Sequence, residues 1–509
     1  MQSEPKAVEG SGSRPASAGD GRMPGSAQFR NYVAGSWRTG SRTLANINPA
    51  DGCRIGDIFE ADEELVTLAV TAARQALAGA WGRTTLEARC RLLEAIAQGI
   101  DDRFDEFVAA EVRDTGRTVQ QARTLDVPRA AQNFRSYASV LRTAGTECFE
   151  TATPDGRGAL NYVIRRPVGV VAAIVPWNLP LLLLSWKVAP ALGAGNAVIA
   201  KPSDETPSTA TLLAEVMDQV GVPQGAFSLL HGGGVGSTGE RLVRNPGVDA
   251  ITFTGGTHTG RTIMRHAAER VKRISLELGG KNAAVVFADA DLDAAIEGTL
   301  RSAFSNSGQV CLCTERIYVE RTIFEAFIGQ LVVRTGGLKS GFPDVPETSL
   351  GPLISARQRE RVLGYVDLAR QDGGIIHVGG AIPSFGDERD QGFYFEPTVV
   401  SGLPPGSRFN QEEVFGPICH VAPFDDEEQA VALANSTDFG LAAVLWTSEL
   451  SRAHRVAARL RAGIVWVNDW YLRDLRTPFG GLGQSGLGRE GGRYSLEFFT
   501  EPTNVCIRL

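Results

Sequence analysis

Four short apolar segments, separated by stretches with helical spacing, constrain the fold of this chain more than any other feature. The segments are GVVAAIVP (169–176), NAVIAKP (196–202), FSLLHG (227–232) and VDAITFTG (248–255), and helix-forming stretches such as PSTATLLAEVMDQVG lie between them. Strands that alternate with helices predict a mostly parallel sheet covered by helices on both faces. Such a sheet binds its ligands at the carboxyl ends of the strands, so a nucleotide site is expected there.

The length of the chain predicts more than one domain. Its 509 residues exceed what a single hydrophobic core usually supports. A further apolar segment (282–289) and a second alternating region between about 310 and 470 predict another α/β lobe. From Thr84 to about Asp114, apolar residues recur every three or four positions, which predicts amphipathic helices that begin at a Thr84/Thr85 cap.

Charge and hydropathy argue against two classes of partner. A net charge of −7 and the absence of long Lys/Arg blocks give no footprint for nucleic acid. The most apolar stretch is interrupted by prolines, Asn178 and Lys187, so we expect no membrane span. Residues 1–27 are rich in Ser, Gly, Pro and Ala and predict a disordered tail, with no apolar region typical of a signal peptide. We therefore expect a cytoplasmic protein.

The cysteines are too scattered for a disulfide scaffold. There are seven, at positions 53, 90, 148, 311, 313, 419 and 506. An odd, dispersed set is typical of reduced thiols. Cys311 and Cys313 lie close together in SNSGQVCLCTER (305–316), but no histidine spacing completes a zinc site around them, so no metal is expected. Taken alone, the pair fits two small core residues as well as a nucleophile beside a bystander.

Two glycine-rich turns follow predicted strands. GVGSTG has Gly234, Gly236 and Gly239 in the G-x-G-x-x-G spacing of a dinucleotide-binding turn. GGTHTG (255–260) also follows a strand and opens a helix, where backbone N–H groups can face a pyrophosphate. Because glycine makes up 58 of 509 residues, each turn alone fits an ordinary loop equally well.

Five motifs in one order resemble the aldehyde dehydrogenase superfamily. They are VPWNLP (175–180), SLELGGK (275–281), FSNSGQVCLCTER (304–316), EEVFGP (412–417) and PFGGLGQSGLGREGG (478–492). The resemblance covers residues 28 to 509 and implies an α/β fold with a Rossmann-type cofactor lobe, an α/β catalytic lobe and a bridging β-hairpin for oligomerisation. The implied boundaries are an NAD-binding domain at 28–146 and 169–279, a bridging segment at 147–168 and 494–509, and a catalytic domain at 280–493.

The resemblance assigns three catalytic roles. The family pattern G-Q-x-C maps the nucleophile to Cys311 and leaves Cys313 as a packing neighbour. Glu277 matches the base that activates water, and Asn178 matches the donor to an oxyanion. The apolar neighbours of Glu277 would raise its pKa toward the range that a base needs. From the residues alone, Glu277 also fits a surface glutamate and Asn178 a turn residue.

The resemblance also implies NAD as the cofactor. Lys201 and Asp204 match the positions that hold the adenosine ribose, Glu413 matches the carboxylate on the nicotinamide ribose, and Phe415 is expected near the nicotinamide. A carboxylate at position 204 would repel a 2′-phosphate, which favours NAD over NADP. The other expected cofactor contacts are Trp177, Gly236, Thr254, Gly255, Gly256 and Leu278.

Three further segments are similar to the 2-hydroxymuconate and 2-aminomuconate 6-semialdehyde dehydrogenases. They are ELGGKNAAVVFADADLDAAIEG, WYLRDLRTPFGG and NVCIRL. The implied substrate is an aldehyde with a distal carboxylate, for which an arginine fork is the best partner. Arg129 and Arg473 match the substrate arginines of that subfamily. Without the resemblance, Arg129 fits an exposed helix residue and Arg473 fits an ion pair with Asp474.

Three alternatives are a dehydrogenase for another aldehyde, a CoA-acylating relative and a catalytically silent homologue. Glu277 argues against the CoA-dependent reaction, which requires no base to activate water. The intact set of Cys311, Glu277 and Asn178 argues against silence. Finally, TATPDGRGALNYVIRRP (151–167) predicts a hairpin with a DG turn, whose exposed edge indicates a homodimer or homotetramer.

Overall fold

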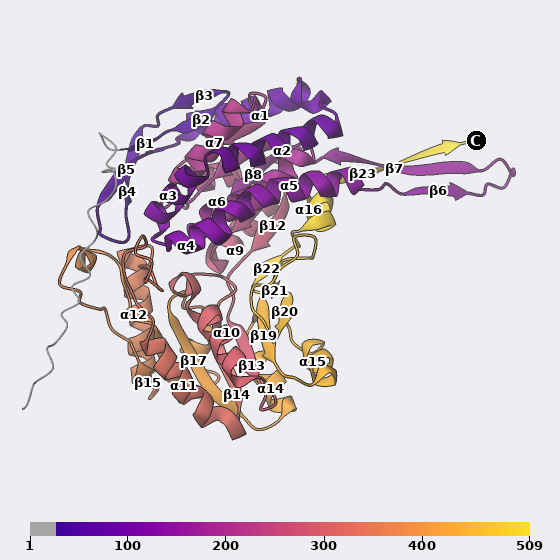
Figure 1. The fold of residues 1–509 in the computed structure, drawn as a ribbon. Coiled ribbons are helices and arrows are strands. Elements are labelled where there is room, and N and C mark those ends of the chain that lie inside the picture. The colour runs from indigo at the N-terminus through magenta and orange to yellow at the C-terminus, as the bar shows by residue number, and fades with distance from the viewer. Residues whose placement is uncertain (1–26) are drawn as a thin grey trace, which may run out of the picture.

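The computed structural model describes residues 27–509, which form two lobes and a projecting arm (Figure 1). The disordered tail predicted for residues 1–27 lies outside the described residues except for its last position. Within residues 27–509, no helix is long and apolar enough to cross a membrane.

An eight-stranded sheet forms the centre of the first lobe, in the order β22-β12-β11-β8-β9-β10-β2-β3, where β22 is Gly486–Leu487. The four strands predicted from the apolar segments are confirmed as β8 (Val170–Ile174), β9 (Ala197–Lys201), β10 (Phe227–Leu229) and β11 (Ala250–Thr254). Together with β12 (Arg273–Glu277) they run parallel. The antiparallel strands β2 (Asn31–Val33) and β3 (Ser36–Arg38) close the far edge. The small sheet beside it contains β1 (Ala27–Phe29), β4 (Arg42–Ile47) and β5 (Arg54–Glu60).

Helices cover both faces of this sheet because its strands alternate their side chains between two cores. Val171 and Ala173 of β8 pack with α2 (Leu86–Asp102), α5 (Val127–Thr143), α6 (Pro180–Gly193) and α7 (Ser208–Gln219). Val170 and Ala172 pack with α1 (Glu63–Ala78), α8 (Thr238–Arg244) and α9 (Thr257–Ala268). The amphipathic helices predicted after Thr84 are α2 and α3 (Phe104–Thr115), and the Thr85 hydroxyl accepts a 3.2 Å hydrogen bond at the start of α2.

The second lobe contains a seven-stranded sheet, in the order β15-β16-β17-β14-β13-β19-β20. Its strands are β13 (Asn282–Val286), β14 (Thr314–Glu320), β15 (Ile375–Val378), β16 (Thr398–Ser401), β17 (Ile418–Phe424), β19 (Ala442–Trp446) and β20 (Ile464–Val467). All pairs are parallel except that between β15 and β16. The main helices of this lobe are α10 (Leu292–Phe304), α11 (Phe324–Gly336) and α12 (Ala356–Gln371). The predicted second α/β lobe is therefore confirmed.

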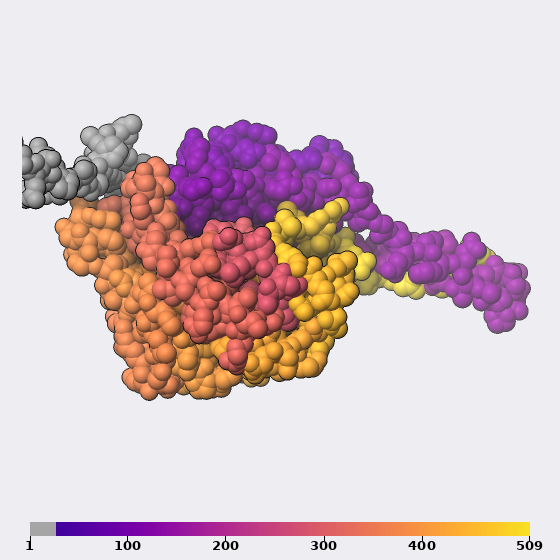
Figure 2. Space-filling view, turned by 60° about the horizontal axis from the view of Figure 1, so that its bottom comes forward, coloured from indigo at the N-terminus to yellow at the C-terminus, as the bar shows by residue number. Residues whose placement is uncertain are grey.

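A three-stranded antiparallel arm extends from the first lobe (Figures 1 and 2). It contains the predicted hairpin, as β6 (Cys148–Thr151) and β7 (Ala159–Pro167), and the C-terminal strand β23 (Thr500–Arg508). β23 pairs with the whole length of β7, from Thr500 opposite Pro167 to Arg508 opposite Ala159. Shortly before it, β22 (Gly486–Leu487) pairs with β12 and places Gly486 opposite Glu277.

Candidate active site

The carboxyl ends of the parallel strands in the first lobe carry several of the predicted site residues. Lys201 ends β9, Thr254 ends β11 and Glu277 ends β12, while Asn178 follows β8. Parallel strands bring these ends to one edge of the sheet, as the sequence pattern predicts. Cys311 belongs to the second lobe, in the loop before β14. The candidate site therefore draws residues from both lobes.

One cavity brings Cys311, Glu277 and Asn178 together. The other predicted residues that line it are Trp177, Thr254, Gly255, Gly256, Leu278, Glu413 and Phe415. Cys311 is half-buried in the cavity wall, whereas Cys313 is only 3% exposed and packs in the hydrophobic core. The two neighbouring cysteines thus have different environments, and only Cys311 is among the residues that line the cavity.

The segment before Cys311 has an unusual backbone. Asn306 and Ser307 both have φ of 53°, and Gly308 has φ of 72°. A Cβ atom on Gly308 would lie 1.9 Å from the carbonyl oxygen of Gly416, so this close approach requires glycine. The side chain of Gln309 then fixes the turn, because its Oε1 accepts a 2.9 Å hydrogen bond from the N–H of Ile354. These contacts explain why Gly and Gln precede the cysteine.

Two asparagine side chains hold the cysteine loop in place. Nδ2 of Asn282 donates to the carbonyl oxygens of Cys311 at 2.7 Å and Cys313 at 2.8 Å. Nδ2 of Asn178 donates to the carbonyl oxygen of Gln309 at 2.9 Å. The buried amide of Asn178 is thereby oriented toward the segment that ends in Cys311. A side-chain amide in this position can donate to a developing negative charge on oxygen.

Burial raises the pKa values of three groups in this cavity. The pKa of the Cys311 thiol rises to about 12, with Glu413 and Glu277 adding to the effect of burial. Burial raises the pKa of Glu413 to about 7, against the 2.9 Å hydrogen bond that its carboxylate accepts from the N–H of Gly280. Burial and the charge of Glu490 raise the pKa of Glu277 well above its usual value. A carboxyl group with a raised pKa suits proton transfer near neutral pH.

Glu277 is placed to exchange protons with a molecule in the cavity. Its side chain is buried, and neither carboxyl oxygen has a hydrogen-bond partner within residues 27–509. A buried carboxyl group without a partner is costly, so a water or a substrate in the cavity would relieve that cost.

A buried ion pair that the sequence analysis missed influences Glu277. Nζ of Lys187 lies 2.6 Å from Oε1 of Glu490, and it donates a 3.0 Å hydrogen bond to Oγ1 of Thr252. The charge of Lys187 lowers the pKa of Glu277, against the opposite effect of Glu490. The sequence does contain a sign of this ion pair, because Lys187 is the one charged residue in the apolar stretch 169–200. A lone charge in such a stretch requires a buried partner.

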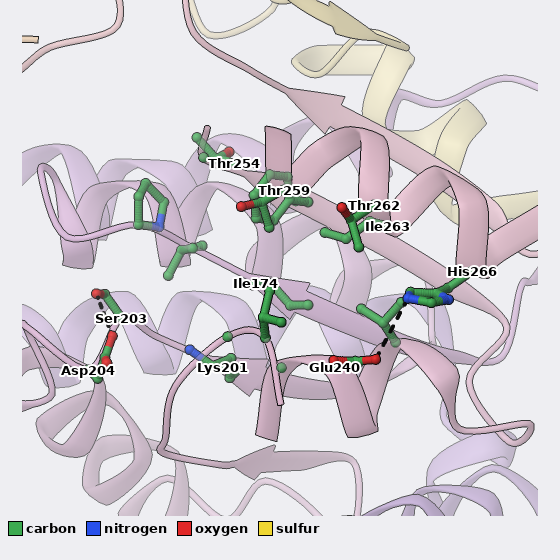
Figure 3. Close-up of a pocket in the computed structure, with 18 residues that line it drawn as sticks. Ile174, Lys201, Ser203, Asp204, Glu240, Thr254, Thr259, Thr262, Ile263 and His266 are labelled. Atoms are coloured by element: carbon green, nitrogen blue, oxygen red, sulfur yellow. Dashed lines mark hydrogen bonds and ion pairs between the residues drawn. The ribbon is translucent and has the colours of Figure 1, made fainter. Parts of the chain in front are cut away.

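A second cavity adjoins the first and is drawn in Figure 3. Lys201 and Asp204 line it, and Pro176, Thr254, Gly255 and Thr259 line both cavities. Space is open in front of Gly234 and Gly256, where an added Cβ would meet no atom within 4 Å. Two adjoining cavities with open backbone loops fit an elongated ligand such as a dinucleotide. Predicted Gly236 does not line either cavity, and its N–H instead donates to Glu240 at 2.9 Å.

A third cavity contains both predicted substrate arginines, Arg129 on α5 and Arg473 in the loop before β21 (Leu482–Gly483). The Arg473 guanidinium lies 4.0 Å from the ring centre of Phe479 and 4.4 Å from that of Trp186. Its Nε and Nη2 atoms are buried and have no hydrogen-bond partner in the described part of the chain.

The surroundings of these two arginines differ from the simpler interpretations of the sequence. Asp474 forms its ion pair with Arg476, at 2.6 Å, and not with Arg473. Arg129 is half-buried where a plain helix arginine would be exposed. The third cavity therefore has a positively charged wall that can bind an anion.

Comparisons with known proteins agree with this architecture. Residues 37–505 match the aldehyde dehydrogenase family. A 2-aminomuconic 6-semialdehyde dehydrogenase from Pseudomonas sp. is 54% identical over 95% of this chain and 98% of its own length. A 2-hydroxymuconic semialdehyde dehydrogenase from Pseudomonas sp. strain CF600 is 52% identical over 95% of this chain and 100% of its own.

The crystal structure of betaine aldehyde dehydrogenase from Staphylococcus aureus in complex with NAD+ has a TM-score of 0.91 against this chain. It is 36% identical, and the likeness covers 94% of each chain. The two-lobed fold is that of an oxidoreductase. The chain belongs to the aldehyde dehydrogenase family.

Proposed function

We propose that this enzyme uses NAD to oxidise the aldehyde group of 2-aminomuconate or 2-hydroxymuconate 6-semialdehyde to a carboxylate. The observation that carries the choice of substrate is the Arg473 guanidinium, whose buried Nε and Nη2 atoms have no hydrogen-bond partner among residues 27–509. A substrate with a carboxylate at its far end would supply that partner. The names of the two Pseudomonas relatives support the same choice.

In this proposal, Cys311 is the nucleophile. Its thiol releases a proton to solvent as the sulfur attacks the aldehyde carbon, and the oxygen of the tetrahedral adduct accepts hydrogen bonds from the Asn178 amide and the N–H of Cys311. NAD supplies the chemistry of hydride acceptance when it is bound. Loss of the hydride from the adduct leaves a thioester on Cys311. Glu277 then takes a proton from water, which attacks the thioester, releases the carboxylate and regenerates the thiol.

The cofactor is proposed to extend along the first two cavities. Lys201 and Asp204 would hold the adenosine ribose, and Glu413 would hold the nicotinamide ribose. The remaining predicted contacts that line these cavities are Trp177, Thr254, Gly255, Gly256, Leu278 and Phe415. Gly236, which was also predicted, lies in the loop before α8 and donates a hydrogen bond to Glu240. The rings of Trp177 and Phe415 meet edge to face at 5.4 Å and would form an apolar wall beside the nicotinamide. The NAD+ complex of the staphylococcal enzyme supports this choice of cofactor.

The proposed substrate can be tested with two aldehydes of similar length. We expect Arg473→Ala and Arg129→Ala to lower kcat/KM for the muconate semialdehyde by about tenfold to a hundredfold, because each removes a charge-assisted contact. A neutral aldehyde should be affected far less. Arg142→Ala is the matched control, since that arginine lies on α5 like Arg129 but pairs with Glu87 and does not line the third cavity.

Three results are informative. Selective loss at Arg473 and Arg129, with no change at Arg142, supports the proposal. Equal losses on both aldehydes would indicate a defect in folding or cofactor binding. No loss on either aldehyde would refute the carboxylate contact and, with it, the choice of substrate.

We also infer that the chain forms a homodimer or homotetramer through the arm and acts in the cytoplasm. Within residues 27–509, β6 and β23 are both unpaired edges of the arm sheet, and Phe149 is 60% exposed on β6. Free edges with apolar residues favour pairing between copies. The seven cysteines form no disulfide, which fits a reducing compartment. Sedimentation of Phe149→Asp, with a shift toward single chains expected, checks the assembly.

A further inference from the structure

The cofactor cavity ends in two side chains, the carboxylate of Glu240 and the imidazole of His266, that the proposed reaction does not use. Figure 3 shows Glu240 and His266 facing each other on one side of the cavity, with Ser203 and Asp204 on the opposite side. Oε1 of Glu240 lies 3.8 Å from Nε2 of His266. This separation is too long for a hydrogen bond, so each side chain can still form a hydrogen bond with a ligand in the cavity.

Both side chains are held in position by the elements that carry them. Glu240 lies on α8, where its Oε2 accepts the 2.9 Å hydrogen bond from Gly236 and its Oε1 is 3.1 Å from Nε of Arg244. The hydrogen bond from Gly236 holds the pKa of Glu240 below its ordinary value. His266 lies on α9 and is 16% exposed, with Nδ1 3.7 Å from Glu269. The cavity thus presents a fixed carboxylate beside an imidazole.

The walls next to this pair combine hydroxyl and apolar side chains. Helix α9 turns Thr259, Thr262, Ile263 and His266 toward the cavity, at the spacing of one helical face. Val243 of α8 and Phe253 of β11 add apolar surface. If Lys201 and Asp204 hold the ribose, this end of the cavity is available to bind the base of the same nucleoside.

We propose that Glu240 and His266 recognise the edge of the adenine ring and so distinguish it from 6-oxopurines. This inference rests on the proposed use of NAD. The edge of adenine presents an amino donor beside a ring nitrogen that accepts. The Glu240 carboxylate can accept from the amino group while an imidazole N–H donates to the ring nitrogen. A 6-oxopurine places an acceptor oxygen where the amino group would be, opposite the carboxylate.

The test compares the binding of NAD and nicotinamide hypoxanthine dinucleotide, which differ in the purine substituent. Calorimetry on the full-length protein gives Kd for each, without turnover. We expect the unaltered protein to bind NAD at least about tenfold more tightly, because the oxo group costs one charge-assisted hydrogen bond. In Glu240→Gln the two Kd values should approach each other, since a carboxamide can donate to the oxo group.

Glu269→Gln is the matched control, because Glu269 also approaches His266 but does not line the cavity. It should keep the preference of the unaltered protein. Equal binding of the two dinucleotides by the unaltered protein, or an unchanged preference in Glu240→Gln, would overturn adenine recognition and leave NAD as the cofactor intact. Failure to bind either dinucleotide would overturn both proposals.

Discussion

Lys187 and Glu490 are 303 positions apart in the sequence, yet their side chains form a buried ion pair with 2.6 Å between Nζ and Oε1. The pair joins α6 to the turn that follows β22, the strand that pairs with β12 at Glu277. It therefore connects the stability of the first lobe to the electrostatics of the proposed base.

Replacing Glu490 by Gln is expected to change both the stability of the first lobe and the pKa of Glu277. The variant leaves Lys187 buried without a counter-charge, which should cost about 3–5 kcal/mol in the free energy of unfolding. Because the charge of Glu490 raises the pKa of Glu277, its removal should lower that pKa. The acidic limb of the pH profile of turnover should consequently move to lower pH. Denaturant unfolding measures the loss of stability, and the pH profile of turnover measures the shift in pKa. Glu497→Gln, at an exposed position, is the control. An acidic limb that moves to higher pH would contradict the expected effect on Glu277.

The two cysteines of the loop should respond differently to substitution. Cys311→Ala is expected to abolish NADH formation while NAD still binds, because the attacking sulfur is gone. Cys313→Ala removes only a buried sulfur from the core, so we expect activity to persist with a loss of about 1 kcal/mol in stability. Turnover, calorimetric Kd and melting temperature separate the effects. The assignment is reversed if the change at 313 stops turnover and the change at 311 does not.

Glu277→Gln should separate the two halves of the reaction. Hydride transfer requires no activated water, so about one NADH per site is expected in a rapid burst. Hydrolysis should then stall and leave an acyl group on Cys311, which mass spectrometry of the intact protein detects. A variant that shows neither the burst nor the adduct would assign Glu277 a different role.

The sequence predicted the strands of the first lobe because each is a short apolar segment bounded by turns, and buried parallel strands have this pattern. The candidate residues of the catalytic cavity were found because they lie in motifs, and the structure brings Cys311, Glu277 and Asn178 into one cavity. Pairings between distant positions could not be predicted. Glu240 and His266 are ordinary helix residues until α8 and α9 pack together around the cavity.

The two-residue strand β22 was also beyond sequence analysis, because its pairing depends on a neighbouring strand and not on a local pattern. Its place beside β12 has a consequence for how the chain is made. Since β22 pairs with the strand that ends in Glu277, the first sheet lacks this edge until residue 487 has left the ribosome. A partial sheet with the β12 edge open must persist while residues 278–487 are made, and the nascent chain is exposed to wrong pairing during that time.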